Sequence, residues 1–302
     1  GGAGFPAHVK ISSGIGKVDT LILNGAECEP YITADHRLML ERGEAVIGGA
    51  RFIMKALGLK EATIGIEGNK LDAVEHLKSL LPNGDTSIHV ETLKTRYPQG
   101  AEKVLIETCT GREVPFPGLP SDVGVIVMNV TSVAFVSKYL ETGMPLTTKR
   151  LTVDGDIVKQ PKNVEVIIGT PIQELLDFCG GLTAEPGKIL YGGPMMGTCV
   201  ADLSQPILKN NNAILAFSQE RAKLPKASNC IQCGRCVNAC PLGLAAKDIV
   251  VAFNKGNVEL LNQLHADLCM SCGTCSFVCP AKRPLTPSIA LAKIMMKNGG
   301  KK

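Results

Sequence analysis

The chain has 302 residues, a formal net charge of +4 and 45% hydrophobic residues, which is enough apolar material for two or more cored domains. Trp is absent, aromatic residues make up 4%, and the net charge is mild, so the composition gives no case for a nucleic-acid-binding protein with a basic or stacking surface. The longest apolar stretch, residues 123–136, is interrupted by polar residues and falls short of the roughly 20 that a membrane-spanning helix needs.

Apolar runs alternate with helical periodicity over the first 140 residues, and Gly or Pro ends most of the helical segments. Strands are predicted at 20–23, 62–66, 87–92 and 123–128, and helices at 41–57, 71–81, 101–109 and 132–141. Such alternation predicts an α/β fold whose parallel sheet is covered on both faces. From residue 146 the pattern changes to short strands around one helix at 171–178, which predicts a small α+β unit.

The last region contains the one internal repeat of the chain. The pattern C-x2-C-x2-C-x3-C-P begins at Cys230 and recurs at Cys269, displaced by 39 residues. In two-cluster ferredoxins the fourth Cys of each motif binds the other cluster. The spacing therefore predicts two [4Fe-4S] clusters, one held by Cys230, Cys233, Cys236 and Cys279, the other by Cys269, Cys272, Cys275 and Cys240.

Two other uses of cysteine fit less well. Structural zinc favours paired C-x2-C knuckles with four ligands per site, which is not this doubled spacing. A disulfide scaffold would be small and loop-rich, so the sequence favours a reducing cytoplasm. The remaining cysteines have no partner at metal spacing, and burial is expected for Cys109, Cys179 and Cys199.

The chain starts within a glycine-rich segment and ends on Gly-Gly-Lys-Lys, which suggests that sequence is missing at one or both ends.

The glycine-rich opening is a candidate phosphate-binding loop. Gly1, Gly2 and Gly4 would allow close backbone approach to an anion, and Lys10 would supply positive charge. A simple turn would have the same composition, and the segment matches neither the Walker pattern nor the dinucleotide fingerprint.

With its neighbours, however, this loop resembles the FMN-binding start of the NADH-oxidising flavoprotein subunit of respiratory complex I. The resemblance extends to residues 23–30 (Leu-Asn-Gly-Ala-Glu-Cys-Glu-Pro), to a glycine–glutamate loop at 97–103 and to the Asn-Val-Thr run at 129–131. Together with the Gly-Gly-Pro-Met-Met-Gly run at 192–197 and the cysteine motifs, the whole chain is similar to the C subunit of the Rnf complexes, which are ion-translocating NAD:ferredoxin oxidoreductases.

The resemblance implies three domains. Residues 1–145 would form a Rossmann-like domain that binds FMN and NADH, residues 146–218 a β-grasp-type (SLBB-like) domain, and residues 219–302 a helical ferredoxin domain with both clusters. It also implies an electron-transfer enzyme subunit that exchanges hydride between NAD(H) and FMN and passes single electrons between FMN and the clusters. Its partners would be the other subunits of a membrane complex, at whose cytoplasmic face it would lie without a transmembrane segment of its own.

The resemblance also assigns roles to individual residues. Residues implied for FMN, including its phosphate, are Gly1, Gly2, Gly4, Lys10, Asn24, Asn129 and Thr131. Phe5 and Tyr97 would flank the flavin or nicotinamide ring, and the carboxylates lining the nicotinamide pocket would be Glu27, Glu29 and Glu102. Surface or helix-capping charge remains the alternative role for these three carboxylates.

The sequence departs from the complex I subunit at three positions. Ala26 replaces an acidic residue, Cys28 replaces a serine, and Ala101 replaces one of two adjacent glutamates. Ala26 and Ala101 keep open a non-catalytic iron–sulfur relay in which no flavin binds. A second alternative is an NADH-dependent cobalamin reductase of the same superfamily, because such proteins share the flavin and cluster modules.

Overall fold

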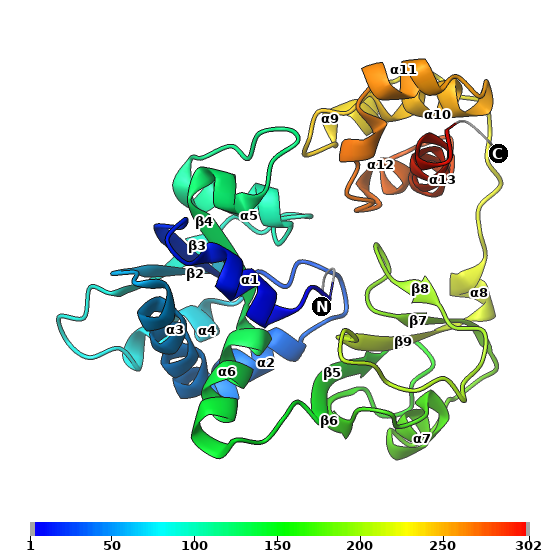
Figure 1. The fold of residues 1–302 in the computed structure, drawn as a ribbon. Coiled ribbons are helices and arrows are strands. Elements are labelled where there is room, and N and C mark those ends of the chain that lie inside the picture. Colours follow the sequence, from blue (N-terminus) through cyan, green and yellow to red (C-terminus); the bar gives the residue numbers. More distant parts are fainter. Residues whose placement is uncertain (1–3, 300–302) are drawn as a thin grey trace. The chain divides into compact units, whose positions relative to one another are not determined.

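The computed structural model describes residues 4–299 and divides the chain into two compact units, residues 1–222 and residues 223–302. Gly1 and Gly2, two of the predicted phosphate-binding residues, lie outside the described residues. The first unit contains two separate sheets and the second unit is helical (Figure 1). None of the described helices combines the length and apolar character that crossing a membrane requires.

The first sheet has four parallel strands in the order β3-β2-β1-β4. Their bounds are β1 (Thr20–Asn24), β2 (Ala62–Glu67), β3 (Ile88–Leu93) and β4 (Val125–Asn129). Leu21 and Leu23 of β1 face one hydrophobic cluster, whereas Ile22 faces another on the opposite side. Because side chains alternate along a strand, this pattern means that both faces of the sheet are covered.

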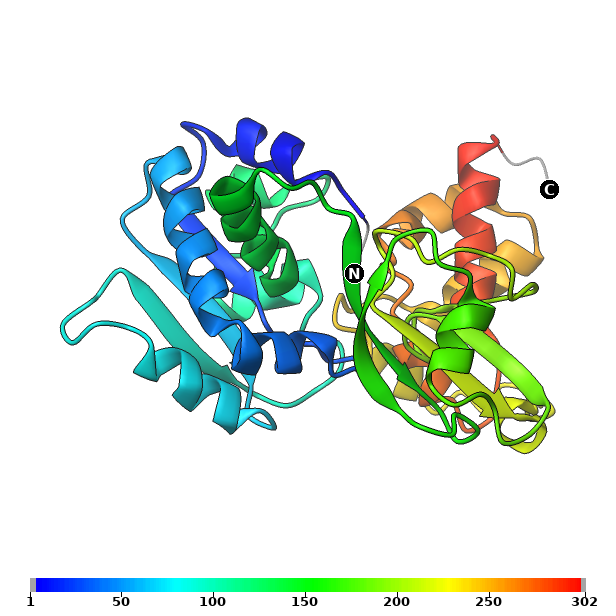
Figure 2. The ribbon, with the colours of Figure 1, turned by 90° about the horizontal axis from the view of Figure 1, so that it is seen from below.

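Helices from different parts of the chain cover the two faces. The helices on the Leu21 face include α1 (Ala7–Gly14), α3 (Gly43–Leu57), α4 (Leu71–Ser79) and α6 (Val130–Thr142). The opposite face is covered by α5 (Glu102–Thr110), through Leu105 and Ile106. α2 (Ala34–Glu41) packs beside α3, α4 and α6, and Figure 2 shows these helices from below. The predicted α/β fold with a parallel sheet is therefore confirmed.

The second sheet is mixed, with strand order β6-β5-β9-β7-β8. Its elements are β5 (Thr148–Asp154), β6 (Lys162–Ile167), α7 (Ile172–Phe178), β7 (Pro186–Tyr191), β8 (Thr198–Cys199), β9 (Ala213–Ser218) and the short α8 (Gln219–Ala222). α7 packs on this sheet through Ile172, Leu175 and Leu176. Cys179 is buried, as expected, and Cys109 partly so; the expectation for Cys199 is wrong, because the edge strand β8 leaves it exposed.

The second unit is built from short helices around one core. These are α9 (Arg235–Asn238), α10 (Ala246–Asn254), α11 (Val258–Gln263), α12 (Thr274–Phe277) and α13 (Leu285–Lys297). α13 buries Ile289 and Met295 in this core but leaves Leu291 and Ile294 exposed.

Candidate functional site

The first candidate site lies at the carboxyl edge of the parallel sheet. β2 and β3 lie on one side of β1, and β4 lies on the other side. The order in which strands are added to the sheet therefore reverses between β1 and β4. Asn24 ends β1, Asn129 ends β4, and the two are paired in register. In open α/β sheets, ligands bind outside the carboxyl ends of the strands at such a reversal. The two asparagines predicted from sequence therefore meet at the position where a ligand is expected.

Asn24 connects two of the predicted loops. Its Nδ2 donates a hydrogen bond to the carbonyl oxygen of Gly100 at 2.8 Å, and its Oδ1 accepts from the amide of Ala26 at 3.2 Å. A Cβ atom added to Gly100 would lie 3.4 Å from the Cys28 sulfur and 3.5 Å from the Ala26 Cβ. The loops after β1 and before α5 are thus packed closely against each other.

Asn129 and Thr131 both bind a residue that the sequence did not single out. Asn129 caps α6 by accepting from the Thr131 amide, and its Nδ2 donates to Asp35 Oδ2 at 2.7 Å. The Thr131 hydroxyl donates to Asp35 Oδ1 at 2.5 Å. Asp35 lies in the first turn of α2, a helix that was not predicted. An acidic residue in a first helical turn is a known helix-start signal, but it could be recognised only together with the helix itself.

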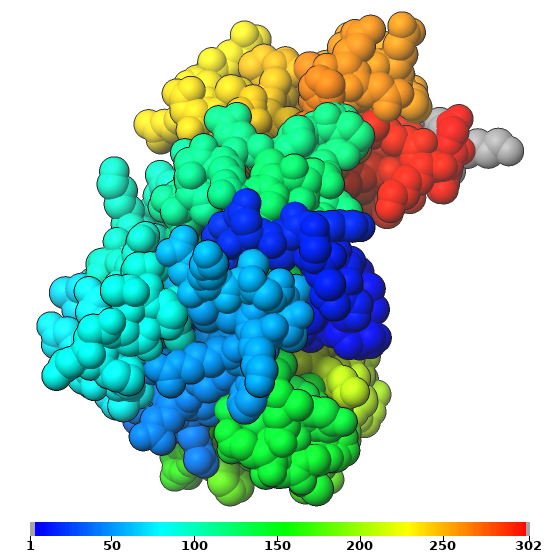
Figure 3. All heavy atoms as spheres, turned by 60° about the vertical axis from the view of Figure 1, so that its left-hand side comes forward, coloured from blue at the N-terminus to red at the C-terminus, as the bar shows by residue number. Residues whose placement is uncertain are grey.

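Lys10 and Glu102 were predicted to serve different ligands, and the fold brings them together. Lys10 Nζ donates to Glu102 Oε1 at 2.6 Å and to the carbonyl oxygen of Val127 at 2.8 Å. Lys10 belongs to α1 rather than to a loop, because helical structure begins soon after Pro6. α1 lies on the surface of the first unit, in dark blue in Figure 3. Phe5 precedes it and is 61% exposed.

Glu27 holds the start of α2. Its two carboxylate oxygens accept hydrogen bonds from the amides of Asp35 and His36, at 2.7 and 2.9 Å. Glu27 itself has a left-handed backbone conformation with φ of 43°. Burial, together with the nearby Asp35 carboxylate, raises the pKa of Glu27 to about 8. Glu27 therefore caps α2, and helix capping was the alternative to a role in the nicotinamide pocket.

Glu29 joins the parallel sheet to the second sheet of the same unit. Its carboxylate accepts from the amides of Met195 and Met196, at 3.1 and 2.9 Å, in the Gly-rich run at 192–197. A Cβ on Gly193 would stand 2.2 Å from Glu29 Oε2, so this contact depends on the absence of a side chain there. Burial raises the pKa of Glu29. Tyr97, the other predicted ring neighbour, is partly buried.

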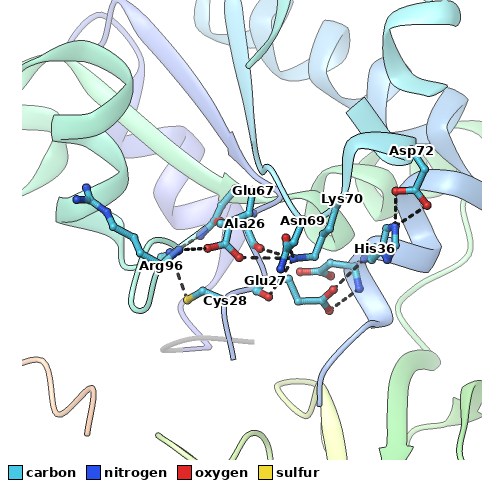
Figure 4. Close-up of polar contacts among 12 residues, drawn as sticks. Ala26, Glu27, Cys28, His36, Glu67, Asn69, Lys70, Asp72 and Arg96 are labelled. Carbon is cyan, nitrogen blue, oxygen red and sulfur yellow. Dashed lines mark hydrogen bonds and ion pairs between the residues drawn. The ribbon is translucent and has the colours of Figure 1, made fainter. Parts of the chain in front are cut away.

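A buried ion pair supports these loops, and no sequence motif predicted it. Lys70 Nζ lies 3.5 Å from Glu67 Oε2 and donates to the carbonyl oxygen of Ala26 at 3.0 Å (Figure 4). Glu67 also accepts from the Arg96 amide at 3.0 Å. The Cys28 sulfur accepts from the Gly100 amide at 3.3 Å, and burial raises the pKa of this thiol to about 11, so it is protonated at neutral pH.

The second candidate site consists of two hollows in the helical unit. The first hollow is lined by four cysteines: Cys230, Cys233, Cys236 and Cys279. The second hollow is lined by the other four: Cys240, Cys269, Cys272 and Cys275. The fourth Cys of each motif thus lies at the hollow of the other motif, which is the crossed arrangement expected from the sequence.

The backbone has the same local geometry at both hollows. The Gln232 amide lies 3.4 Å from the Cys230 sulfur, and the Ser271 amide lies 3.4 Å from the Cys269 sulfur. Gln232 and Ser271 both have positive φ, at 55° and 57°. Among the described residues, no three His, Cys, Asp or Glu side chains converge closely enough for a single metal ion. Each hollow is lined by four thiols, and four thiolates are the donor set that holds a [4Fe-4S] cluster.

Known protein families match the three parts of the chain in turn. The Nuo51 FMN-binding domain matches residues 1–138, the SLBB domain residues 150–198, and the 4Fe-4S dicluster domain residues 226–283. The NAD+-reducing [NiFe]-hydrogenase in its H2-reduced state has a similar fold, with a TM-score of 0.64 at 18% identity over 97% of this chain and 58% of that one.

Curated relatives are much more similar in sequence. The C subunit of the Na(+)-translocating ferredoxin:NAD(+) oxidoreductase complex of Acetobacterium woodii is 46% identical over 97% of this chain and 66% of its own length. The proton-translocating counterpart of Clostridium ljungdahlii is 49% identical over 81% of this chain and 53% of its own, and the C subunit of the ion-translocating oxidoreductase complex of Rhodobacter capsulatus 40% over 86% and 50%. The chain therefore spans half to two thirds of these relatives, and it belongs to the family formed by the C subunits of ion-translocating oxidoreductase complexes.

Proposed function

We propose that this chain is the electron-transfer subunit of an ion-translocating ferredoxin:NAD(+) oxidoreductase and that it binds FMN, NAD(H) and two [4Fe-4S] clusters. The observation that carries the proposal is the distribution of eight cysteines around two hollows, four to each, in the crossed pattern. The names of the relatives and the matching FMN-binding domain support the flavin and nicotinamide parts.

The donors at both hollows fit iron–sulfur clusters. Each hollow offers four thiols and a backbone amide directed at a sulfur, and such thiolates are the usual ligands of a [4Fe-4S] cluster. One cluster would be held by Cys230, Cys233, Cys236 and Cys279, the other by Cys240, Cys269, Cys272 and Cys275.

The residues at the sheet edge fit FMN. Lys10, Asn24, Asn129 and Thr131 offer an ammonium, two amides and a hydroxyl where ligands of open α/β sheets bind. Gly1, Gly2, Gly4 and Lys10 would hold the phosphate, and Phe5 and Tyr97 would flank the rings. When bound, FMN supplies the conversion between two-electron hydride transfer and one-electron transfer. Binding would exchange some internal hydrogen bonds, among them those of Lys10 to Glu102 and of Thr131 to Asp35.

The three proposed carboxylates have different environments. Glu102 is 41% exposed and paired with Lys10, so it can move to a nicotinamide when Lys10 turns to a phosphate. Glu27 and Glu29 are bound to backbone amides, and their part would be to keep the loop after β1 in shape.

The proposal extends to organisation and partners. Residues 1–145 would be the FMN and NADH domain, residues 146–218 a β-grasp-type domain and residues 219–302 the two-cluster domain. A five-stranded sheet with α7 packed on it supports the second assignment. The chain would attach peripherally to the other subunits at the cytoplasmic face of a membrane.

Anaerobic reconstitution with iron, sulfide and FMN, followed by NADH titration, tests this proposal. Bleaching of the flavin absorbance, followed by EPR signals from two reduced clusters, is the expected result. Lys10→Met should weaken FMN binding, whereas Lys17→Met, which changes an exposed residue after α1, should not. If the clusters form but the chain neither retains FMN nor responds to NADH, the flavin assignment is overturned. The chain would then be an iron–sulfur relay.

A further inference from the structure

The two hollows are related by the internal repeat but are lined differently. A shift of 39 residues relates Cys230 to Cys269 and Cys240 to Cys279, and it relates most lining positions in the same way. Two positions differ in charge. The first hollow has Lys247 where the second has Thr286, and Arg283 where the second has Leu244.

The hollows also differ in their access to solvent. Cys230 and Cys233 of the first hollow are exposed, and Ile231 between them is 67% exposed. None of the four cysteines at the second hollow is exposed, and Cys272 and Cys275 are buried. Water therefore reaches the first set of sulfurs more readily.

Among the residues that line the hollows, Arg283 supplies the main difference in charge. Lys247 Nζ pairs with Asp248 at 2.6 Å, which offsets much of its field. Arg283 donates to the carbonyl oxygen of Ser228, and no ion pair of Arg283 is found among the described residues. The surroundings are basic as well, because residues 223–302 contain eleven Lys and Arg against three Asp and Glu, a formal net charge of +8.

Two features oppose this difference. Lys293 Nζ donates to the carbonyl oxygen of Cys269 at 2.7 Å, although Lys293 does not line the second hollow. The hydroxyls of Thr274 and Thr286 lie 3.2 and 3.4 Å from the sulfurs of Cys272 and Cys275, and hydrogen bonds to sulfur favour the reduced cluster. The two amide contacts, in contrast, are equal at both hollows. A hydroxyl is a dipole whose field falls faster with distance than that of a full charge. Lys293 is one cation bound to a backbone oxygen, whereas Lys247 and Arg283 both line the first hollow, so these two cations and the solvent access outweigh the opposing features.

We propose that Arg283, with a smaller contribution from Lys247, gives the cluster in the first hollow the higher reduction potential of the two. The inference rests on the proposed presence of both clusters. Each cluster takes up one electron without bond formation, and the added negative charge is stabilised by nearby cations and by water. At equilibrium a single electron therefore resides mainly at the first hollow, beside the exposed Cys230 and Cys233.

The test is a potentiometric titration of the loaded full chain with dithionite, followed by EPR. Two one-electron steps are expected. Arg283→Gln should lower the upper step alone and shift electron sharing towards the second cluster by about tenfold, equivalent to about 59 mV for one electron. Lys297→Gln removes an exposed cation of α13 that lines neither hollow, and it should leave both steps in place.

The converse variant separates charge from loss of structure. Thr286→Lys places a cation at the second hollow and should raise the lower step. Iron and sulfide content is measured first in the parent chain and in every variant. A parent chain that holds fewer than two clusters overturns the proposed function itself, and only variants that hold two clusters are titrated. This inference alone is overturned if both clusters have the same reduction potential. It is also overturned if Arg283→Gln lowers the potential of the lower step, or changes neither potential.

Discussion

At the scale of single residues, the contact between Glu29 and the Gly-rich run at 192–197 depends on close packing within the first unit. Two backbone amides bind one carboxylate, and Gly193 must lack a side chain for that carboxylate to fit. Hydrogen bonds to a charged group typically contribute about 1.5–3 kcal/mol, so this contact is a substantial link between the two sheets.

Gly193→Ala should therefore destabilise the chain by about 1–3 kcal/mol, because the new methyl group would overlap with the Glu29 carboxylate. Urea unfolding of the first unit within the full chain measures the change. In a Glu29→Ala background the overlap with the carboxylate disappears and only the contact with the Cβ of residue 29 at 2.9 Å remains, so the same Gly193→Ala substitution should cost clearly less. Equal costs in both backgrounds would show that the two positions are not coupled.

Glu27 predicts a specific dependence of stability on pH. Its pKa is raised from 4.5 to about 8 by burial and by Asp35, so the folded chain holds its proton more tightly than the unfolded chain. This contribution is fully present below pH 4.5 and is lost as the pH rises through 8. Glu27→Gln removes it, so the variant should gain stability relative to the parent by roughly 1 kcal/mol per pH unit within that window. Urea unfolding at about pH 5 and about pH 8 measures the free energy of unfolding of both proteins. A difference between parent and variant that is the same at both pH values would contradict the prediction.

The residues of the sheet-edge site were only partly predictable. Asn24 and Asn129 follow buried strands, so their meeting at one edge of the sheet follows from the pattern. Lys10 and Glu102 are far apart in sequence, and their ion pair depends on how α1 and α5 pack on the sheet. Asp35, Glu67 and Lys70 belong to no motif, because a buried polar residue is recognised only by the partners that the tertiary fold provides.

At the scale of elements, the crossing of α3 and α6 determines where two adjacent glycines can be changed. A Cβ on Gly49 would lie 2.0 Å from the carbonyl oxygen of Val133 in α6, whereas a Cβ on Gly48 would meet only the end of the Ser137 side chain. Gly49→Ala should thus cost about 1–3 kcal/mol by forcing the helices apart. Gly48→Ala is the matched control, and its higher helix propensity should offset most of any strain. Similar unfolding midpoints for the two variants would refute the close crossing.

The strands were easier to predict than the first helices. β1, β2 and β4 are largely apolar runs, whereas β3 alternates apolar and polar residues, and the predicted limits of all four differ from the observed ones by at most two residues. The helix predicted at 41–57 includes the end of α2, because a strong apolar period starts there and Gly43 alone does not reveal the break at Arg42. α1 was not predicted, because glycines before Pro6 suggested a loop.

At the scale of the whole molecule, the two compact units carry formal net charges of opposite sign. Residues 223–302 carry a formal net charge of +8, which leaves −4 for residues 1–222 within the total of +4. The repeat of the cysteine motif predicts the crossed sets of cysteines, because in two-cluster ferredoxins the fourth Cys of each motif binds the other cluster, and the same two sets line the two hollows. The different linings of the two hollows could not be foreseen, since they depend on which residues the helices α10 and α13 bring to each hollow.

The segment that joins the two compact units should be the first site of proteolysis. Residues 223–229 are exposed and form neither helix nor strand, and they include Lys223 and Lys226. Proteases cut such segments first, because a folded unit must open before its backbone can enter the active site of the protease. Brief trypsin treatment of the loaded chain should therefore yield fragments ending at Lys223 or Lys226, identified by mass spectrometry. Replacing both lysines by Gln should slow this cleavage markedly, whereas earlier cuts within residues 4–222 would show that the first unit is the less stable part.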